Sequence, residues 1–283
     1  MVARPVPTAR RARLAAELRK LRERAGMTAT EAAAAIGTSS GQLSNVETAR
    51  FGVSPERVRA MARVYSVCDP QLVDALAAMA TDRTNGWWEQ YRGVLPPSLL
   101  DLAELEHHAL TLRAAYTAHI PGLLQTPDHA REVFRQVLPE LTPPEVEHRV
   151  SHRIKRQEVL YRSNPIPYTA IIHEAALRMQ FGGPAIVKGQ LSHLVEMGER
   201  KHVRILVIPF NAGSFPGAGQ SIYYARGPVP QLDTVHLDQS HGPALVDAEA
   251  RLGGYRLLLD RMEAMALDRE ESSQFVISIL RSL

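Results

Sequence analysis

Histidine is the residue type in this sequence that most directly suggests chemistry, because the chain holds 11 of them. His148 and His152 are four residues apart in a segment with helical periodicity, a spacing that can hold a divalent metal ion. The neighbouring positions carry arginine and lysine, and no cysteine or other third ligand follows nearby. We therefore interpret this pair as part of a solvated basic helix face and predict no metal site.

Three other patterns that resemble catalytic or nucleotide-binding motifs are incomplete. His107 and His108 are adjacent, so on a helix they point to different faces and cannot chelate together. The pair His173-Glu174 has no second histidine at the HExxH position, and the glycine-containing loop 211–220 lacks the Gly-Lys-Ser/Thr ending of a phosphate-binding loop. The sequence thus predicts a protein that is not an enzyme and that holds no cofactor.

The stretch from Thr28 to Glu47 has the pattern of two short helices joined by a tight turn. Thr28 and Glu31 have the spacing of a capping box, which satisfies free amide groups at a helix start. An alanine run over 32–35 favours that helix, and Gly37 ends it by allowing a left-handed backbone conformation.

The second of these helices is predicted to present a polar face to solvent. Ser39 is placed to cap it, while Leu43 and Val46 are three apart and face one side. A slim first helix lets a second one lie across it and project into a DNA groove, which is helix-turn-helix geometry. The outward positions include Gly41, and the predicted DNA-contacting residues are Thr28, Ser39, Ser40, Gln42, Ser44, Asn45 and Arg50.

The charge distribution favours the same conclusion. Residues 1–66 hold 12 Lys and Arg against 5 Asp and Glu, whereas the other 217 residues hold 21 against 25. A basic segment beside an acidic remainder indicates a nucleic-acid partner for the basic part. Phosphate attraction would supply most of the affinity, with Arg50 and the basic first helix as the contacts, and the polar helix face would supply sequence choice.

The elements that position this stretch form a predicted all-α domain of five helices. The first spans 10–24 with Leu14, Leu18 and Leu21 inward, and Ser54-Pro55 and Asp69-Pro70 begin the last two. We divide the chain into a flexible arm at 1–8, this domain at 9–82 and a second domain at 85–283, with the polar sequence TDRTNG as the boundary.

The second domain is predicted to be α+β or α/β, mainly helical with a small sheet. Apolar runs at 166–172, 203–208, 215–224 and 234–237 are expected to be strands. Helices are expected at 99–115, from Pro127, at 143–161, 186–199, 245–266 and 268–283. The apolar segment 121–126 begins at a turn, and we keep two interpretations for it: a pocket wall or partner surface, or a buried loop.

The N-terminal pattern resembles the Xre (Cro/repressor) type of DNA-binding domain. Further on, the segments LAELEHHA, IPGLLQTPDHAREVF, HEAALRMQFGG and VRILVIPFNAG resemble the DUF5753 domain of actinobacterial WhiJ-type regulators. Two features depart from that family: Gln42 and Asn45 replace two cations of the reading helix, and Ala49 stands where glycine is usual. Because amides pair well with adenine and arginine with guanine, the operator preference is expected to differ.

The resemblance implies a transcriptional regulator, and we expect it to bind double-stranded DNA as a homodimer. It also implies a small partner protein of the DUF397 kind, and some members of the family are described as antitoxin-like. A small-molecule sensor with an apolar pocket is the alternative for the second domain. The single cysteine, Cys68, and the absence of a long apolar run favour a cytoplasmic protein without a membrane span.

Overall fold

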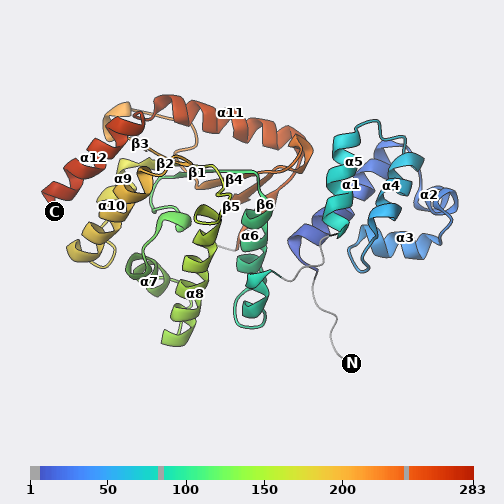
Figure 1. The fold of residues 1–283 in the computed structure, drawn as a ribbon, viewed down its shortest axis with the longest axis horizontal. Coiled ribbons are helices and arrows are strands. Elements are labelled where there is room, and N and C mark those ends of the chain that lie inside the picture. Colours follow the sequence, from blue (N-terminus) through green and yellow to red (C-terminus); the bar gives the residue numbers. More distant parts are fainter. Residues whose placement is uncertain (1–6, 82–85, 239–241) are drawn as a thin grey trace. The chain divides into compact units, whose positions relative to one another are not determined.

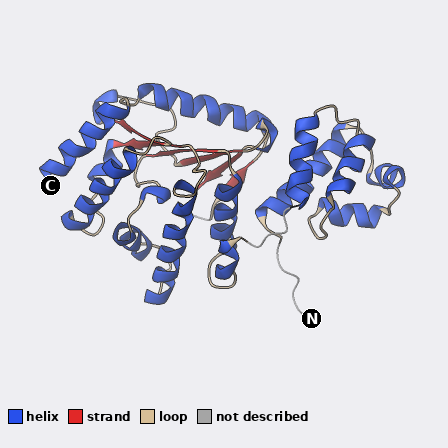
Figure 2. Cartoon of the chain, viewed as in Figure 1, coloured by secondary structure: helices blue, strands red, loops and turns tan. Residues whose placement is uncertain are grey.

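The computed structural model describes residues 7–81, 86–238 and 242–283. The chain separates into two compact units, Met1–Glu89 and Gln90–Leu283. Most of the predicted arm and most of the predicted boundary lie outside the described residues. Figures 1 and 2 show a helical N-terminal unit and a C-terminal unit built around a sheet.

The N-terminal unit confirms the five predicted helices. They are α1 (Ala9–Arg24), α2 (Ala29–Ile36), α3 (Ser40–Glu47), α4 (Pro55–Val64) and α5 (Pro70–Thr81). Local capping explains why the sequence locates them so well: Ser54 accepts a hydrogen bond from the Arg57 amide, and the Asp69 carboxylate accepts from the amides of Gln71 and Leu72. Their apolar stripes meet in a core that includes Leu18, Leu43, Val58, Met61 and Leu76.

The C-terminal unit contains a six-stranded mixed sheet in the order β3-β2-β1-β4-β5-β6. The strands are β1 (Thr111–Tyr116), β2 (Tyr168–His173), β3 (Val203–Ile208), β4 (Ile222–Arg226), β5 (Thr234–Leu237) and β6 (Ala244–Val246). β1 lies between a parallel neighbour, β2, and an antiparallel neighbour, β4. The second half of the sheet, from β4 to β6, is an antiparallel meander.

Helices cover both faces of this sheet, as Figure 1 shows. The α-helices are α6 (Pro97–His108), α7 (Pro127–Arg135), α8 (Pro143–Arg156), α9 (Glu174–Arg178), α10 (Pro184–Gly198), α11 (Glu249–Met265) and α12 (Arg269–Ser282). Short 3-10 helices lie at Trp87–Tyr91, Gly122–Leu124, Gln157–Leu160, Phe210–Ala212 and Pro230–Leu232. Alternating strand residues separate two cores, one shared with α6, α9, α10 and α12, the other with α11.

Three expectations about secondary structure are wrong. The predicted helix over 99–115 ends at His108, and its last part is β1, the strand in the middle of the sheet. The spacing of Ala109 and Leu112 fits a helix stripe as well as a buried strand, and only pairing with distant strands decides between them. β6 occupies the predicted start of the helix over 245–266, and the strand expected at 215–224 begins only at Ile222.

The expectation of a solvated basic face on the arginine-rich helix is wrong at its C-terminal end. His152 and Arg156 of α8 are buried, and Arg156 pairs with the fully buried Glu106. Glu106 accepts two hydrogen bonds from Arg156 there, at 2.8 and 2.6 Å. Of the two interpretations of segment 121–126, the structure agrees with a buried loop, because Leu123, Leu124 and Gln125 are all buried within the unit.

Membrane and metal sites can be addressed for the described ranges alone. Within them, no helix is both long and apolar enough to cross a bilayer. Nor does this part of the chain bring together three or more His, Cys, Asp or Glu side chains that could hold a metal ion. His148 is exposed while His152 is buried, so the two histidines do not form a joint site.

The C-terminal unit contains two buried histidines, and we predict that they lower its free energy of unfolding in mild acid. Burial, with the nearby Arg156 and Arg153, lowers the pKa of His152 to about 3, and burial with the nearby His119 and Arg153 lowers the pKa of His129 to about 4. The unfolded chain, with a histidine pKa near 6.5, therefore binds more protons than the folded one as the pH falls below that value. Each histidine should cost about 1–2 kcal/mol between neutral pH and about pH 5.

Urea unfolding of the full chain at both pH values measures this loss. The variant His152→Leu should lose less stability between the two pH values than the wild type. An equal loss in the variant would show that His152 does not carry the effect.

Candidate nucleic-acid interface

The helix pair α2 and α3 has the geometry that the sequence predicts. The Thr28 side chain accepts from the Glu31 amide at 3.3 Å, and the Glu31 carboxylate accepts from the Thr28 amide at 2.8 Å, which completes the capping box. Gly37 ends α2 with φ 76° and ψ 41°, a left-handed conformation that costs glycine little. The Ser39 hydroxyl accepts from the Gln42 amide at 3.2 Å and so begins α3.

Helix α3 buries one side and exposes the other. Leu43 and Val46 lie in the core, whereas Ser40, Gln42 and Ser44 are exposed. The Asn45 side chain is partly exposed. Of the other residues predicted to contact DNA, Thr28, Ser39 and Arg50 are all exposed. Every one of these side chains is therefore at least partly accessible, and α3 presents a continuous row of hydroxyl and amide groups.

One interaction inside the row orients a side chain that is predicted to contact DNA. The Thr38 hydroxyl donates to the Gln42 side-chain oxygen at 2.5 Å. With its oxygen engaged, the Gln42 amide nitrogen remains as the hydrogen-bond donor toward solvent. No side-chain hydrogen bond engages Asn45 among the described residues, so both of its amide atoms are available to a ligand.

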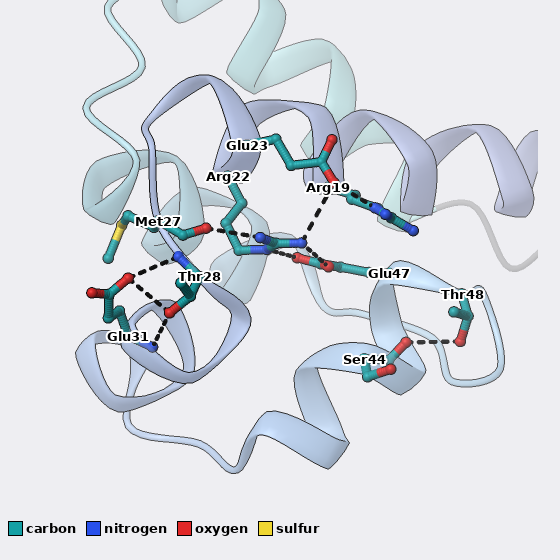
Figure 3. Close-up of polar contacts among 9 residues, drawn as sticks. All are labelled: Arg19, Arg22, Glu23, Met27, Thr28, Glu31, Ser44, Glu47 and Thr48. Carbon is teal, nitrogen blue, oxygen red and sulfur yellow. Dashed lines mark hydrogen bonds and ion pairs between the residues drawn. The ribbon is translucent and has the colours of Figure 1, made fainter.

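A buried ion pair fixes the end of α3 to α1, as Figure 3 shows. The Arg22 guanidinium donates to both carboxylate oxygens of Glu47, at 2.7 and 2.8 Å, and to the Met27 carbonyl at 2.8 Å. The two side chains are only 10% and 6% exposed. A bidentate pair of this kind restricts both the distance and the rotation of the helix end. The sequence does not reveal this pair, because the two residues are 25 positions apart and look like ordinary surface charges.

The chain leaves α3 through a left-handed residue. Ala49 has φ 57° and is buried. The family that this sequence resembles usually has glycine at this position, so an alanine adopts the left-handed backbone conformation here. The Thr48 hydroxyl donates to the Ser44 carbonyl at 2.7 Å, and the Phe51 amide donates to the Asn45 carbonyl at 3.0 Å. These bonds close the last turn of α3 and direct Arg50 outward.

Two exposed arginines lie at this exit from α3. A Cβ atom added to Gly52 would lie 3.8 Å from Nη2 of Arg11, so the α1 side chain reaches the segment that follows α3. Among residues 7–81, Arg11 and Arg50 form no ion pair, unlike Arg13, Arg19 and Arg22, which pair with glutamates. Unpaired exposed cations beside a polar helix face are suited to binding phosphate groups.

Removal of Arg50 should weaken DNA binding equally on all sequences. We expect Arg50→Ala to reduce the slope of log affinity against log salt by about 1 and to leave the preferred site unchanged, because a phosphate contact carries no base information. Fluorescence anisotropy over a salt series measures the slope. Arg281→Ala, which removes one exposed charge from the other unit, is the control and should leave the slope as it is in the wild type.

Comparisons with protein families agree with this arrangement. Residues 13–76 match a helix-turn-helix domain, which covers α1 through most of α5. Residues 99–278 match the family described as a domain of unknown function, DUF5753. The chain belongs to the DUF5753 family. No curated protein and no solved structure matches it.

The family assignment and the helix-turn-helix match support a DNA-binding regulator with a DUF5753 domain. The DUF5753 match spans the whole sheet, from before β1 to the middle of α12. The strands and the helices that cover them are thus one family unit. Its description assigns no activity, so the role of this unit has to be argued from its side chains.

Proposed function

We propose that this DUF5753 protein is a sequence-specific transcriptional regulator of the WhiJ type that binds double-stranded DNA as a homodimer. In this proposal α3 enters the major groove and its polar side chains contact base edges. The observation that carries the proposal is the split face of α3: Leu43 and Val46 are buried, and the hydroxyl and amide groups face solvent. The Arg22–Glu47 pair supports it, because base reading needs a helix held in a fixed orientation.

Selection of bound duplexes from a random pool tests the proposal. A homodimer with one α3 in each half-site should select an inverted repeat. The centres of its two half-sites should be about 34 Å apart, which is one helical turn of DNA. Recovery of a defined repeat supports the proposal. A chain that binds no duplex at low ionic strength, where phosphate attraction is strongest, would refute it.

Asn45→Ala should change sequence preference at one base pair in each half-site. An amide that makes two hydrogen bonds to adenine is worth about 1–3 kcal/mol of discrimination, so the variant should lose that amount at one position and nothing elsewhere. Competition binding with duplexes mutated one position at a time measures the loss. Gln71→Ala, an exposed amide on α5, is the matched control. Uniform weakening on every duplex would contradict a reading role for Asn45.

For the DUF5753 unit we propose a regulatory rather than a catalytic role: it binds a partner or an effector and thereby changes DNA affinity. The partner that the family resemblance implies is a small DUF397-type protein. The buried position of segment 121–126 argues against this segment as a docking surface. Thermal unfolding of the full chain with that partner tests the first possibility: a raised melting temperature supports partner binding, and an unchanged one argues against it.

A further inference from the structure

A group of polar side chains lies on the sheet face that α6, α9, α10 and α12 cover. Tyr223 of β4 pairs in register with His236 of β5 and with Ala114 of β1, so these side chains share one face. Tyr168 and Tyr116 lie on the same face of β2 and β1. Three tyrosines and a histidine on the inner face of a sheet are unusual for a purely structural core, which favours aliphatic side chains.

Part of this group is fully satisfied by its own members. Glu106 of α6 is 0% exposed and accepts two hydrogen bonds from Arg156, at 2.8 and 2.6 Å. The Tyr223 hydroxyl donates to the same carboxylate at 2.6 Å. Three charge-assisted hydrogen bonds fix the Glu106 carboxylate in place, so Glu106, Arg156 and Tyr223 hold one another in fixed positions.

Arg153, one turn before Arg156 on α8, is not satisfied in this way. Its guanidinium donates to the Gln125 side-chain oxygen at 2.6 Å and lies 4.4 Å from the centre of the Phe134 ring. Its Nε atom is buried without a hydrogen-bond partner, and no carboxylate of the described chain pairs with it. Burial, together with the charge of Arg156, lowers the pKa of Arg153 to about 10. The charged form of Arg153 is therefore destabilised at this position relative to water.

Two further buried polar groups of the C-terminal unit lack partners. The Tyr168 hydroxyl is buried without a hydrogen bond, in a side chain that is 1% exposed. Both ring nitrogens of His129, also 1% exposed, are buried and unpartnered as well. Arg153 packs on the Phe134 ring of α7, the helix that also carries His129, and Tyr168 pairs in register with Leu112 of β1, the strand that ends at Tyr116. An unsatisfied buried polar group is costly, and several together call for a missing partner.

We propose that this cluster is a binding site for a small organic anion, whose carboxylate or phosphate group is bound by Arg153. The free groups are an N–H of a guanidinium, a phenol and an imidazole, so hydrogen-bond donors outnumber acceptors, as an oxyanion requires. Arg153 and Tyr116 are partly exposed, which gives the site access to solvent. The exposed Asp238 acts on both of them and disfavours ligands of high negative charge.

Among the described residues of this cluster, Arg153 is the cation without a carboxylate partner, so we expect a metabolite-sized ligand with one anionic group. The inference rests on the proposed function only where it calls this molecule an effector. Anion binding and DNA binding are measured separately, so either can fail without the other. The site is polar, in contrast to the apolar pocket that the sequence suggested for a small-molecule sensor.

Isothermal titration calorimetry on the full chain tests the site with two probes, sodium phosphate and sodium benzoate, at constant ionic strength set by sodium chloride. We expect at least one probe to bind the wild type, and the preferred probe tells phosphate from carboxylate recognition. Arg153→Gln should weaken that binding about tenfold or more, the factor that corresponds to 1.4 kcal/mol. Arg149→Gln, one turn earlier on α8, is the matched control and should bind as the wild type does.

Tyr168→Phe provides a readout that a structural role would not give. Because the Tyr168 hydroxyl has no partner in the unliganded protein, its removal should leave the melting temperature unchanged or raise it while it weakens anion binding. Failure of both probes to bind, or equal binding by the wild type and Arg153→Gln, would overturn the proposal. A melting temperature that falls in Tyr168→Phe with anion binding intact would also overturn it.

Discussion

Replacing Glu47 with alanine is expected to lower the free energy of unfolding of the N-terminal unit by about 3–5 kcal/mol. The variant leaves the buried Arg22 guanidinium with the Met27 carbonyl at 2.8 Å and the Glu23 carboxylate at 3.9 Å, and a buried charge that loses its bidentate partner is far more costly than a lost surface pair. DNA affinity should fall as well, because the pair is what holds the end of α3 to α1. Urea unfolding of the full chain, with hydrogen exchange to locate the loss in residues 9–81, measures the effect.

Two further variants show whether burial is the cause. Asp74→Ala removes the partner of Arg59 in an exposed pair and should have little effect on unfolding. The double variant Arg22→Met, Glu47→Leu removes both buried charges and should recover most of the stability. A loss in Glu47→Ala no larger than that in Asp74→Ala would show that the Arg22–Glu47 pair does not stabilise the unit.

Glu106→Gln is expected to destabilise the C-terminal unit by a similar amount, about 3–5 kcal/mol. The substitution keeps the shape of the side chain but removes the charge that Arg156 and the Tyr223 hydroxyl share. The buried Arg156 and the partly exposed Arg153 would then be two neighbouring cations on α8 without an opposite charge in contact. The measurement is urea unfolding followed by circular dichroism, with hydrogen exchange to locate the loss in residues 90–283.

The exposed pair of Arg131 and Glu147 offers a matched control for this prediction. Glu147→Gln removes a charge that also binds an arginine bidentately, at 2.6 and 3.1 Å, but in an exposed position. It should change the free energy of unfolding much less than Glu106→Gln does. Equal effects of the two substitutions would mean that the Glu106 cluster gains nothing from its burial.

The sequence predicts the N-terminal unit well because its signals are local. Thr28 with Glu31, Gly37, Ser39 and Ser54 each set a helix end within three or four residues of themselves, and the structure has those ends. The polar face of α3 follows from the burial of Leu43 and Val46, which is a property of the helix period. Local signals of this kind need no knowledge of the rest of the fold.

What the sequence does not reveal depends on residues that are distant along the chain. β1 is a strand because β2 and β4 pair with it, and nothing within 99–116 shows this. Arg22 and Glu47 look like surface charges until α1 and α3 pack together. Arg153 lies seven residues after Val146 and three after Val150, on the side of α8 that faces the core. An arginine at such a position of the helix period indicates a cation directed into the unit, and this signal is present in the sequence.

The sheet order also bears on how the protein is made. In β1, Leu112 pairs with Tyr168 of β2 and Thr111 pairs with Arg226 of β4. The centre of the sheet can therefore form only after β2 and β4, which follow much later in the chain, have been translated. The helices of the first unit, by contrast, contact near neighbours, and such topologies fold fast. On the ribosome we therefore expect the helix-turn-helix unit to fold while the DUF5753 unit is still being translated, with the edges of β1 unpaired until β2 and β4 follow.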